Sequence, residues 1–158
     1  MKTSSFYFII ITLILSSCSS YNSNTFSSKN PFSGGVYKIG EPYTIQDKIF
    51  FPEEDFFYKE RGIASWYGEK FHGKKTANGE IFNMNLLTAA HRTLQLPSLV
   101  KVTNINNKKS IILRVNDRGP FAKDRIIDLS KKSAALLGFQ KAGTAEVIVE
   151  YYGRANVY

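Results

Sequence analysis

The alternation of apolar and polar positions predicts several short β-strands between about residue 59 and residue 153. In a strand, every second side chain lies on the same face, so a half-buried strand shows this alternation. It is clearest in four segments, which cover residues 62–68, 99–105, 110–116 and 144–153. The second and third segments are joined by the polar sequence NNKK, so we expect them to pair as a hairpin or a close relative of one.

One convincing helix interrupts these strands. Ser130 is a suitable N-cap, the sequence KKSAALL follows it, and Gly138 is a suitable residue just beyond the C-terminus. One or two short helices among several strands, in fewer than about a hundred residues, predict a mostly β domain. A small closed or nearly closed barrel is the architecture that this pattern favours.

The start of the chain has a different pattern. After Lys2, residues 6–15 are apolar except for Thr12, and the sequence LSSC follows, ending at Cys18. This apolar run is too short to span a bilayer but has the layout of an export signal. Its end resembles the lipobox of bacterial lipoproteins, in which residues 1–17 would be removed and Cys18 lipidated. The alternative is a secretory signal with an incidental cysteine.

The resemblance to lipoproteins also carries an expectation about location. Ser19, and not an aspartate, follows the lipidated position. In Gram-negative lipoproteins this pattern implies transport to the outer membrane in preference to the inner one, with the protein facing the periplasm. Cys18 is the only cysteine, so no intramolecular disulfide can form.

Four regions follow from these patterns. Residues 1–17 are the predicted signal peptide, residues 59–153 the barrel and residues 154–158 a short tail. Residues 18–58 begin as a Ser- and Asn-rich tether and continue as a turn-rich segment that we expect to be irregular. Its aromatic residues are expected to pack partly on the barrel; they are Phe50, Phe51, Phe56, Phe57 and Tyr58.

The distribution of charge indicates a polyanionic partner. Residues 59–158 carry 17 basic and 8 acidic side chains, a net +9, whereas residues 18–58 carry 3 basic and 5 acidic ones, a net −2. A strongly basic domain attracts polyanions. For an exported protein we expect peptidoglycan or anionic lipid headgroups in this role, and not nucleic acid.

The residue types exclude several kinds of chemistry. The two histidines, His72 and His91, are 19 residues apart in sequence contexts that match no metal-ligand spacing. The G-x-S-x-G elbow of many serine hydrolases and the glycine-rich phosphate loop are absent from the sequence. We therefore expect neither a metal nor an organic cofactor, and carboxylates remain as the candidate catalytic groups.

Cleavage of a glycosidic bond requires a paired acid and base, or one acid with a polarising neighbour. Glu80 ends the sequence KKTANGE, Asp117 ends a predicted strand, and His91 ends LLTAAH, which we also expect to be a strand. Each has a simpler interpretation as well. Glu80 suits a solvated loop, His91 a hydrogen-bonded strand edge, and Asp117 a tight turn.

The motifs together, GIASWYG, TANGE, TAAH, NDRGPF and RIIDLS, closely resemble the rare lipoprotein A (RlpA-like) family over residues 62–151. The resemblance implies a six-stranded double-psi β-barrel in an exported lipoprotein that binds peptidoglycan. It also implies an active-site set of Glu80, His91 and Asp117. The remaining expected substrate contacts are Trp66, Tyr67, Thr76 and Arg118, while Asp128, just before the helix, is expected to be structural.

The activity implied by this resemblance is that of an endolytic lytic transglycosylase, which cuts glycan strands and leaves 1,6-anhydromuramyl ends. A third interpretation is a structural envelope lipoprotein whose barrel binds another protein. The main alternative is a non-catalytic module that binds or loosens the wall, as some expansin relatives do. In that case Trp66, Tyr67 and basic side chains would form a platform for sugar rings.

Overall fold

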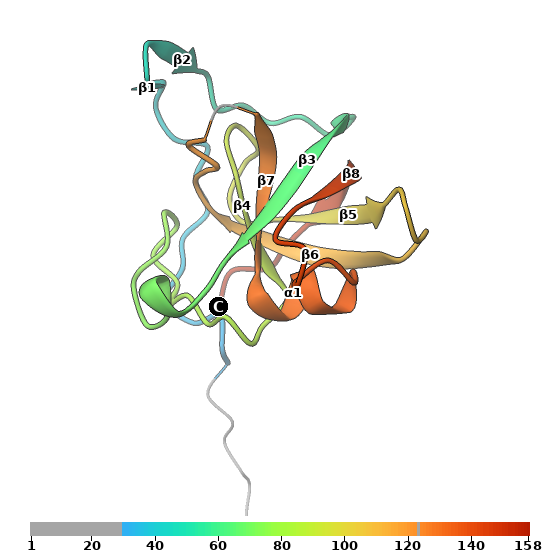
Figure 1. Ribbon diagram of the computed structural model, residues 1–158. Helices are drawn as coiled ribbons and strands as arrows, with labels where there is room; N and C mark the ends of the chain where they lie inside the picture. The colour runs from blue at the N-terminus through green and yellow to red at the C-terminus, as the bar shows by residue number, and fades with distance from the viewer. Residues whose placement is uncertain (1–29, 123) are drawn as a thin grey trace, which may run out of the picture.

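The computed structural model describes residues 30–122 and 124–158, and six of their strands form a closed β-barrel (Figure 1). The predicted signal peptide, Cys18 and the first part of the tether lie outside the described residues. The elements in chain order are β1 (Tyr43–Ile45), β2 (Lys48–Phe50), β3 (Lys59–Tyr67), the 3-10 helix η1 (Glu69–Phe71), β4 (Thr88–His91), β5 (Ser98–Asn104), β6 (Ser110–Asp117), β7 (Arg125–Ser130), α1 (Lys131–Leu136) and β8 (Ala145–Arg154).

The six strands of the barrel follow the order β3-β7-β4-β6-β5-β8 and close on themselves. Two neighbouring pairs, β3 with β7 and β4 with β6, are parallel, and the other pairs are antiparallel. The prediction of a small, mostly β, six-stranded barrel with one short α-helix is therefore confirmed. The predicted β5–β6 hairpin is also confirmed.

The alternation noted in the sequence places the core inside the barrel. Along β5 and β8 every second side chain is buried, and Val100, Val102, Val147 and Val149 are all fully enclosed. The helix begins as expected, because the Ser130 hydroxyl accepts a hydrogen bond from the backbone N–H of Ser133 (3.1 Å). Gly138 follows the helix with φ 80°, a conformation that favours glycine.

Strand β7 was not predicted as a strand, and it determines the geometry of the site. Asp128 lies within it and pairs with Ser65 of β3 on one side and with Ala90 of β4 on the other. Ala90 in turn pairs with Asp117 of β6. A row of four paired residues thus runs across four strands, and side chains of directly paired residues lie on the same face of a sheet. The row places both aspartates on one face, separated by the methyl group of Ala90.

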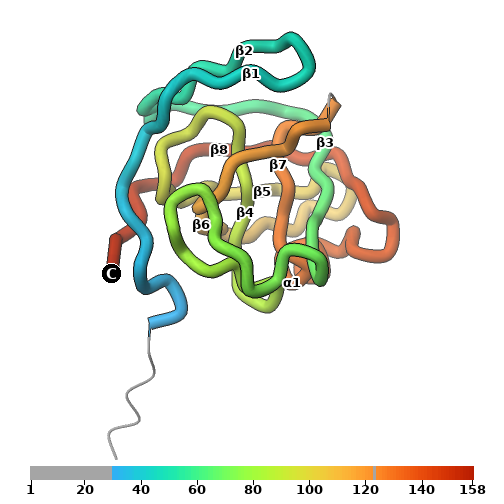
Figure 2. The backbone as a smooth tube through the Cα atoms, turned by 90° about the vertical axis from the view of Figure 1, so that its left-hand side faces the viewer, coloured from blue at the N-terminus to red at the C-terminus, as the bar shows by residue number. Residues whose placement is uncertain are grey.

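The segment before the barrel packs against it. Residues 30–41, here called the strap, run along one side of the barrel (Figure 2). The backbone of the strap bonds to two loops: Val36 donates to the carbonyl of Asn78 (2.8 Å), and Lys38 exchanges two hydrogen bonds with Leu96 (2.7 and 2.8 Å). The strap therefore covers loops of the barrel.

Residues 43–50, which were expected to be irregular, form the antiparallel hairpin β1–β2 at one end of the barrel (Figures 1 and 2). The aromatic residues of this region pack only in part. Tyr58 packs against the core and Phe50 is half-buried, whereas Phe57 is 94% exposed. Among the described helices, none is long and apolar enough to cross a bilayer.

Candidate active-site cleft

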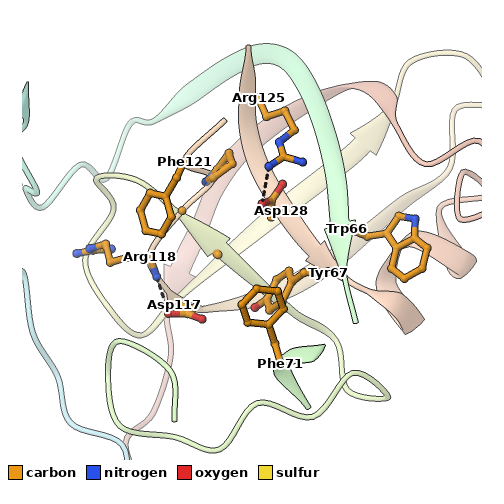
Figure 3. Close-up of a pocket in the computed structure, with 11 residues that line it drawn as sticks. Trp66, Tyr67, Phe71, Asp117, Arg118, Phe121, Arg125 and Asp128 are labelled. Atoms are coloured by element: carbon orange, nitrogen blue, oxygen red, sulfur yellow. Dashed lines mark hydrogen bonds and ion pairs between the residues drawn. The ribbon is translucent and has the colours of Figure 1, made fainter. Parts of the chain in front are cut away.

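An open cleft of about 350 Å³ lies over the four neighbouring strands β3, β7, β4 and β6. Its size is within the range of known ligand sites. The residues that line it are Trp66, Tyr67, Phe71, Ala90, Asp117, Arg118, Gly119, Pro120, Phe121, Arg125 and Asp128. Figure 3 shows the carboxylates of Asp117 and Asp128 and the ring of Tyr67 together in this cleft.

Asp117 is held through one of its two oxygens. Its Oδ1 accepts hydrogen bonds from the backbone N–H groups of Ala77 and Arg118, both at 2.8 Å. Within the described residues Oδ2 has no hydrogen-bond partner. Burial raises the pKa of Asp117, although the two N–H donors and the charge of Arg118 oppose that rise. Gly119, at φ 135°, turns the backbone directly after this pair in a way that an L side chain rarely permits.

Asp128 is the second carboxylate of the cleft. Its Oδ1 accepts a hydrogen bond from the Ser65 hydroxyl (2.7 Å), and its Oδ2 lies 3.4 Å from a guanidinium nitrogen of Arg125. Burial raises its pKa, while Ser65 and Arg125 act in the opposite direction. The sequence assigned Asp128 a structural role, but the structure places it in the cleft with Asp117.

Tyr67 has a buried hydroxyl without a partner among the described residues. Its ring stacks on Phe82 (centroids 4.3 Å apart) and meets the edge of Phe71 (5.7 Å). Burial, followed by the charges of Asp117 and Asp128, raises the pKa of Tyr67 well above its usual value. The hydroxyl therefore stays protonated and can donate a hydrogen bond to a ligand in the cleft.

Of the three other predicted substrate contacts, Trp66 and Arg118 line the cleft but make their polar contacts with the backbone, and Thr76 is not in the lining. The Trp66 indole donates to the carbonyl of Gln140 (3.1 Å) and lies apart from the two carboxylates in Figure 3. The Arg118 guanidinium donates to the carbonyls of Leu94 (2.7 Å), His91 (3.3 Å) and Ile39. Thr76 is buried, and its hydroxyl bonds within its own loop. Arg118 thus fixes the backbone around the cleft, and Thr76 stabilises the loop that holds Asp117.

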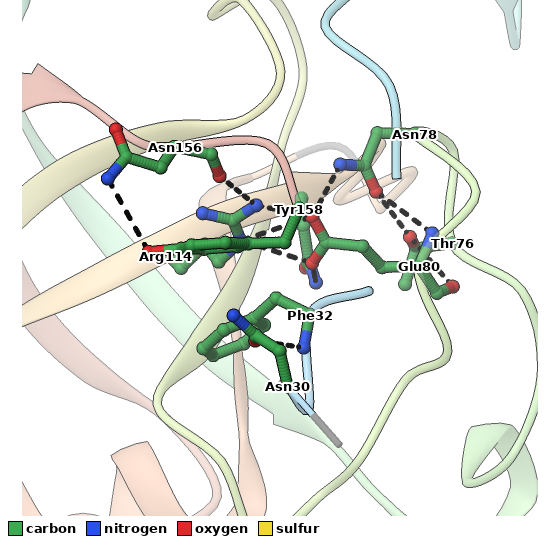
Figure 4. A network of polar contacts seen from close by, with 9 residues as sticks. Asn30, Phe32, Thr76, Asn78, Glu80, Arg114, Asn156 and Tyr158 are labelled. Carbon is green, nitrogen blue, oxygen red and sulfur yellow. Dashed lines mark hydrogen bonds and ion pairs between the residues drawn. The ribbon is translucent and has the colours of Figure 1, made fainter. Parts of the chain in front are cut away.

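Glu80 is fully buried below this loop and is absent from the cleft lining. Its carboxylate accepts hydrogen bonds from Arg114 (2.5 and 3.1 Å) and from the side chain of Asn78 (2.8 Å), both labelled in Figure 4. It also accepts one from the side chain of Asn116 (2.9 Å). Burial alone would raise the pKa of Glu80, but these donors outweigh it and hold the pKa below its ordinary value. Glu80 is therefore ionised.

The strap covers this ion pair from outside. A side chain at Gly35 would meet the Glu80 Cγ at 2.6 Å, so only glycine fits there. The Phe32 ring lies 4.8 Å from the guanidinium of Arg114, which also donates to the carbonyl of Asn156 (2.8 Å). Both ends of the described chain thus enclose the pair.

His91 is also buried, and it faces away from the cleft. Its Nδ1 accepts hydrogen bonds from the backbone N–H groups of Thr93 (3.2 Å) and Leu94 (3.1 Å), which leaves the proton on Nε2, 2.9 Å from the Tyr58 hydroxyl. Burial lowers the pKa of His91 to about 3, so the ring is neutral. His91 shapes the turn whose carbonyls accept from Arg118.

The cleft contains three functional candidates that the sequence did not single out as substrate contacts: Asp128, Phe71 and Phe121. Arg125, which the sequence suggested as a local charge partner or ligand contact, also lines the cleft. The two phenylalanine rings are half exposed, at 51% and 48%, and suit contact with sugar rings. A signal for Asp128 was present, since RIIDLS carries the β-branched residues of a strand. Within residues 30–122 and 124–158, no group of three or more His, Cys, Asp or Glu side chains is arranged to hold a metal ion.

Fold and cleft together define a double-psi β-barrel with a carboxylate-containing cleft open to solvent. The profile of the lytic transglycolase family matches residues 59–149, and the chain belongs to that family.

Several relatives have the name endolytic peptidoglycan transglycosylase RlpA. The protein from Rickettsia bellii is 59% identical over 120 residues, which are 74% of this chain and 53% of the relative. The Campylobacter jejuni protein is 50% identical over 134 residues (84% and 48%), and that of Pseudomonas aeruginosa strain UCBPP-PA14 is 54% identical over 121 (76% and 35%). The chain spans about half the length, or less, of these relatives.

Among solved structures, the Streptomyces papain inhibitor superimposes with a TM-score of 0.52 at 18% identity, over 63% of this chain and 98% of the inhibitor. At this identity the similarity concerns the fold alone.

Proposed function

We propose that this protein is an endolytic peptidoglycan transglycosylase, with Asp117 as its general acid and base. The observation that carries the proposal is the state of the Asp117 carboxylate. One oxygen is fixed by two backbone N–H groups, the other has no hydrogen-bond partner among the described residues, and burial raises the pKa. The similarity to proteins named as such transglycosylases supports the same activity.

The reaction begins with protonated Asp117, which gives its proton to the glycosidic oxygen as the bond from that oxygen to the anomeric carbon breaks. The positive charge that develops on the sugar is stabilised by Asp128 in its ionised form, across Ala90 in the same cleft. Asp117, now a carboxylate, accepts the proton of the muramyl C6 hydroxyl as that oxygen bonds to the anomeric carbon. The product carries a 1,6-anhydro ring, and Asp117 is protonated again.

Glu80 and His91 act as positioning residues in this proposal. Glu80 accepts hydrogen bonds from Asn78 and Asn116. In the sequence, Asn78 directly follows Ala77 and Asn116 directly precedes Asp117. Glu80 thereby supports the 2.8 Å hydrogen bond from the Ala77 N–H to Asp117. His91 shapes the turn that accepts the Arg118 guanidinium.

The location follows from the first residues of the sequence. Lipidation of Cys18 would anchor the chain to a membrane of the envelope, in the outer membrane in preference to the inner one, and expose the basic barrel to the wall. Peptidoglycan is then the polyanion within reach.

The test is digestion of purified sacculi with the mature chain, followed by analysis of the released muropeptides. We expect 1,6-anhydro products. Asp117→Asn keeps the size of the side chain but cannot donate the acidic proton, so turnover should fall by at least about 100-fold with an unchanged fold. Asp128→Asn leaves Asp117 intact, so its effect on turnover measures the contribution of the stabilising carboxylate by itself. Binding to sacculi without release of anhydro products would refute the proposed transglycosylase activity and favour the wall-binding alternative.

A further inference from the structure

A second depression, of about 400 Å³, adjoins the cleft beyond Phe121. Phe121 lines both spaces. The other residues around the depression come mainly from the β1–β2 hairpin: they are Ile45, Gln46, Lys48, Phe50, Arg92 and Asp124. The hairpin lies outside residues 59–149, the part that matches the family profile. The hairpin therefore adds a wall beside the cleft from outside the matched domain.

Aromatic contacts fix the hairpin to the loop that follows Asp117. Tyr43 stacks on Phe50 with ring centroids 5.5 Å apart, and the edge of Phe121 meets Tyr43 at 6.5 Å. Arg92 links the same two parts of the chain. Its guanidinium donates to the carbonyls of Pro120 (2.9 Å) and Ala122 (2.7 Å) and lies 5.2 Å from the Phe50 ring. The depression is thus preformed and its position relative to Asp117 is fixed.

The lining combines aromatic faces with charged side chains, which suits a saccharide that carries an acidic group. The Phe50 and Phe121 rings offer apolar faces for a sugar ring, and the Asp124 carboxylate can accept hydrogen bonds from hydroxyls. Lys48 is exposed, lies 5.4 Å from the Phe50 ring and pairs with no carboxylate in the part of the chain that the structure describes. With Arg92 it gives the depression a net positive charge.

We propose that this depression is a subsite for a further unit of the glycan strand, and that Lys48 binds the lactyl or peptide carboxylate of that unit. The inference rests on the proposed function, because an enzyme that cuts within a strand must hold sugars beyond the bond it breaks. Among the described depressions, this one alone combines a lining residue shared with the cleft and a wall from the hairpin.

The experiment compares two ladders of oligosaccharides by calorimetry with the mature chain. Chitooligosaccharides provide β-1,4-linked N-acetylated sugars without a carboxylate, and peptidoglycan glycan fragments of the same lengths provide the carboxylates. The variant is Lys48→Glu. Its matched control is Lys108→Glu, which reverses an exposed charge in the β5–β6 turn, away from the cleft and the depression.

Wild type should bind long acidic fragments more tightly than neutral ones of equal length. Lys48→Glu should lower that affinity about tenfold, the effect of losing one charge-assisted hydrogen bond, and leave short and neutral ligands unchanged. Equal affinities of Lys48→Glu and Lys108→Glu for the long acidic fragments would refute the subsite. Affinity and release of anhydro products are measured separately. A Lys48-dependent preference in a protein that releases no anhydro product would therefore refute the transglycosylase activity but support the subsite.

Discussion

Replacement of Glu80 by glutamine distinguishes a catalytic from a positioning role for this residue. Glutamine preserves the size of the side chain and one acceptor oxygen, but it removes the negative charge opposite Arg114. The two side chains are 0% and 7% exposed, so the variant leaves a guanidinium buried without its counter-ion. Breaking such a buried pair costs about 3–5 kcal/mol.

A loss of this size is large relative to the stability of an ordinary domain, which is about 5–15 kcal/mol. For a domain of this length it corresponds to a fall in Tm of about 10–20 °C. Turnover should also fall, because the loop that donates the Ala77 N–H to Asp117 loses its anchor. Calorimetry and circular dichroism measure the first effect, and release of anhydro-muropeptides at a temperature where the variant is folded measures the second.

The pH dependence provides a second check on Glu80. Its pKa is lowered in the folded state, so ionised Glu80 stabilises the fold fully above the unfolded pKa of about 4.3 and loses that contribution as pH falls through the folded pKa. The difference in Tm between wild type and Glu80→Gln should therefore shrink in acid. Glu146→Gln, which disrupts the exposed pair with Arg61, is the control and should melt close to wild type. A Glu80→Gln protein with wild-type Tm and no turnover would refute the positioning role and support direct catalysis.

Three further predictions concern Tyr67, the strap and Cys18. Tyr67→Phe removes a buried hydroxyl without a partner, so it should leave stability unchanged or raise it by about 1 kcal/mol, while glycan affinity falls; a marked loss of Tm would mean that the hydroxyl is structural. Removal of residues 1–41 exposes Glu80 and Arg114 and should lower Tm, whereas a wild-type melting curve would show that the strap is dispensable. Cys18→Ser should abolish incorporation of labelled fatty acid, and surviving label would exclude Cys18 as the site.

The sequence predicted those parts of the molecule that local patterns encode. The strands β5, β6 and β8, the Ser130 cap and the strand that ends at Asp117 are all observed, although burial alternates only along β5 and the first part of β8. The hairpin was missed because its strands have three residues each, and its turn uses Gln46 and Asp47 at φ 47° and 62° without the usual glycine.

The role of Glu80 depends on a contact that no local pattern reveals. Its partner Arg114 lies 34 positions away and occupies an ordinary position in a strand. Only the closed barrel brings the two together and places the strap over them. A family motif can thus indicate that a residue matters without indicating whether it touches substrate.

The pairing of Ala90 with both Asp117 and Asp128 has a consequence for how such a site can change. The spacing of the two acids is set by the distance between neighbouring strands, about 4.8 Å each, and not by the length of a loop. A closed barrel has no free edge along which a strand can slip, and a slip of one residue would turn every side chain to the other face. Loops, strap and hairpin can therefore diversify in length and sequence among relatives while the two carboxylates keep their separation, so new ligands can be accommodated around an unchanged pair of acids.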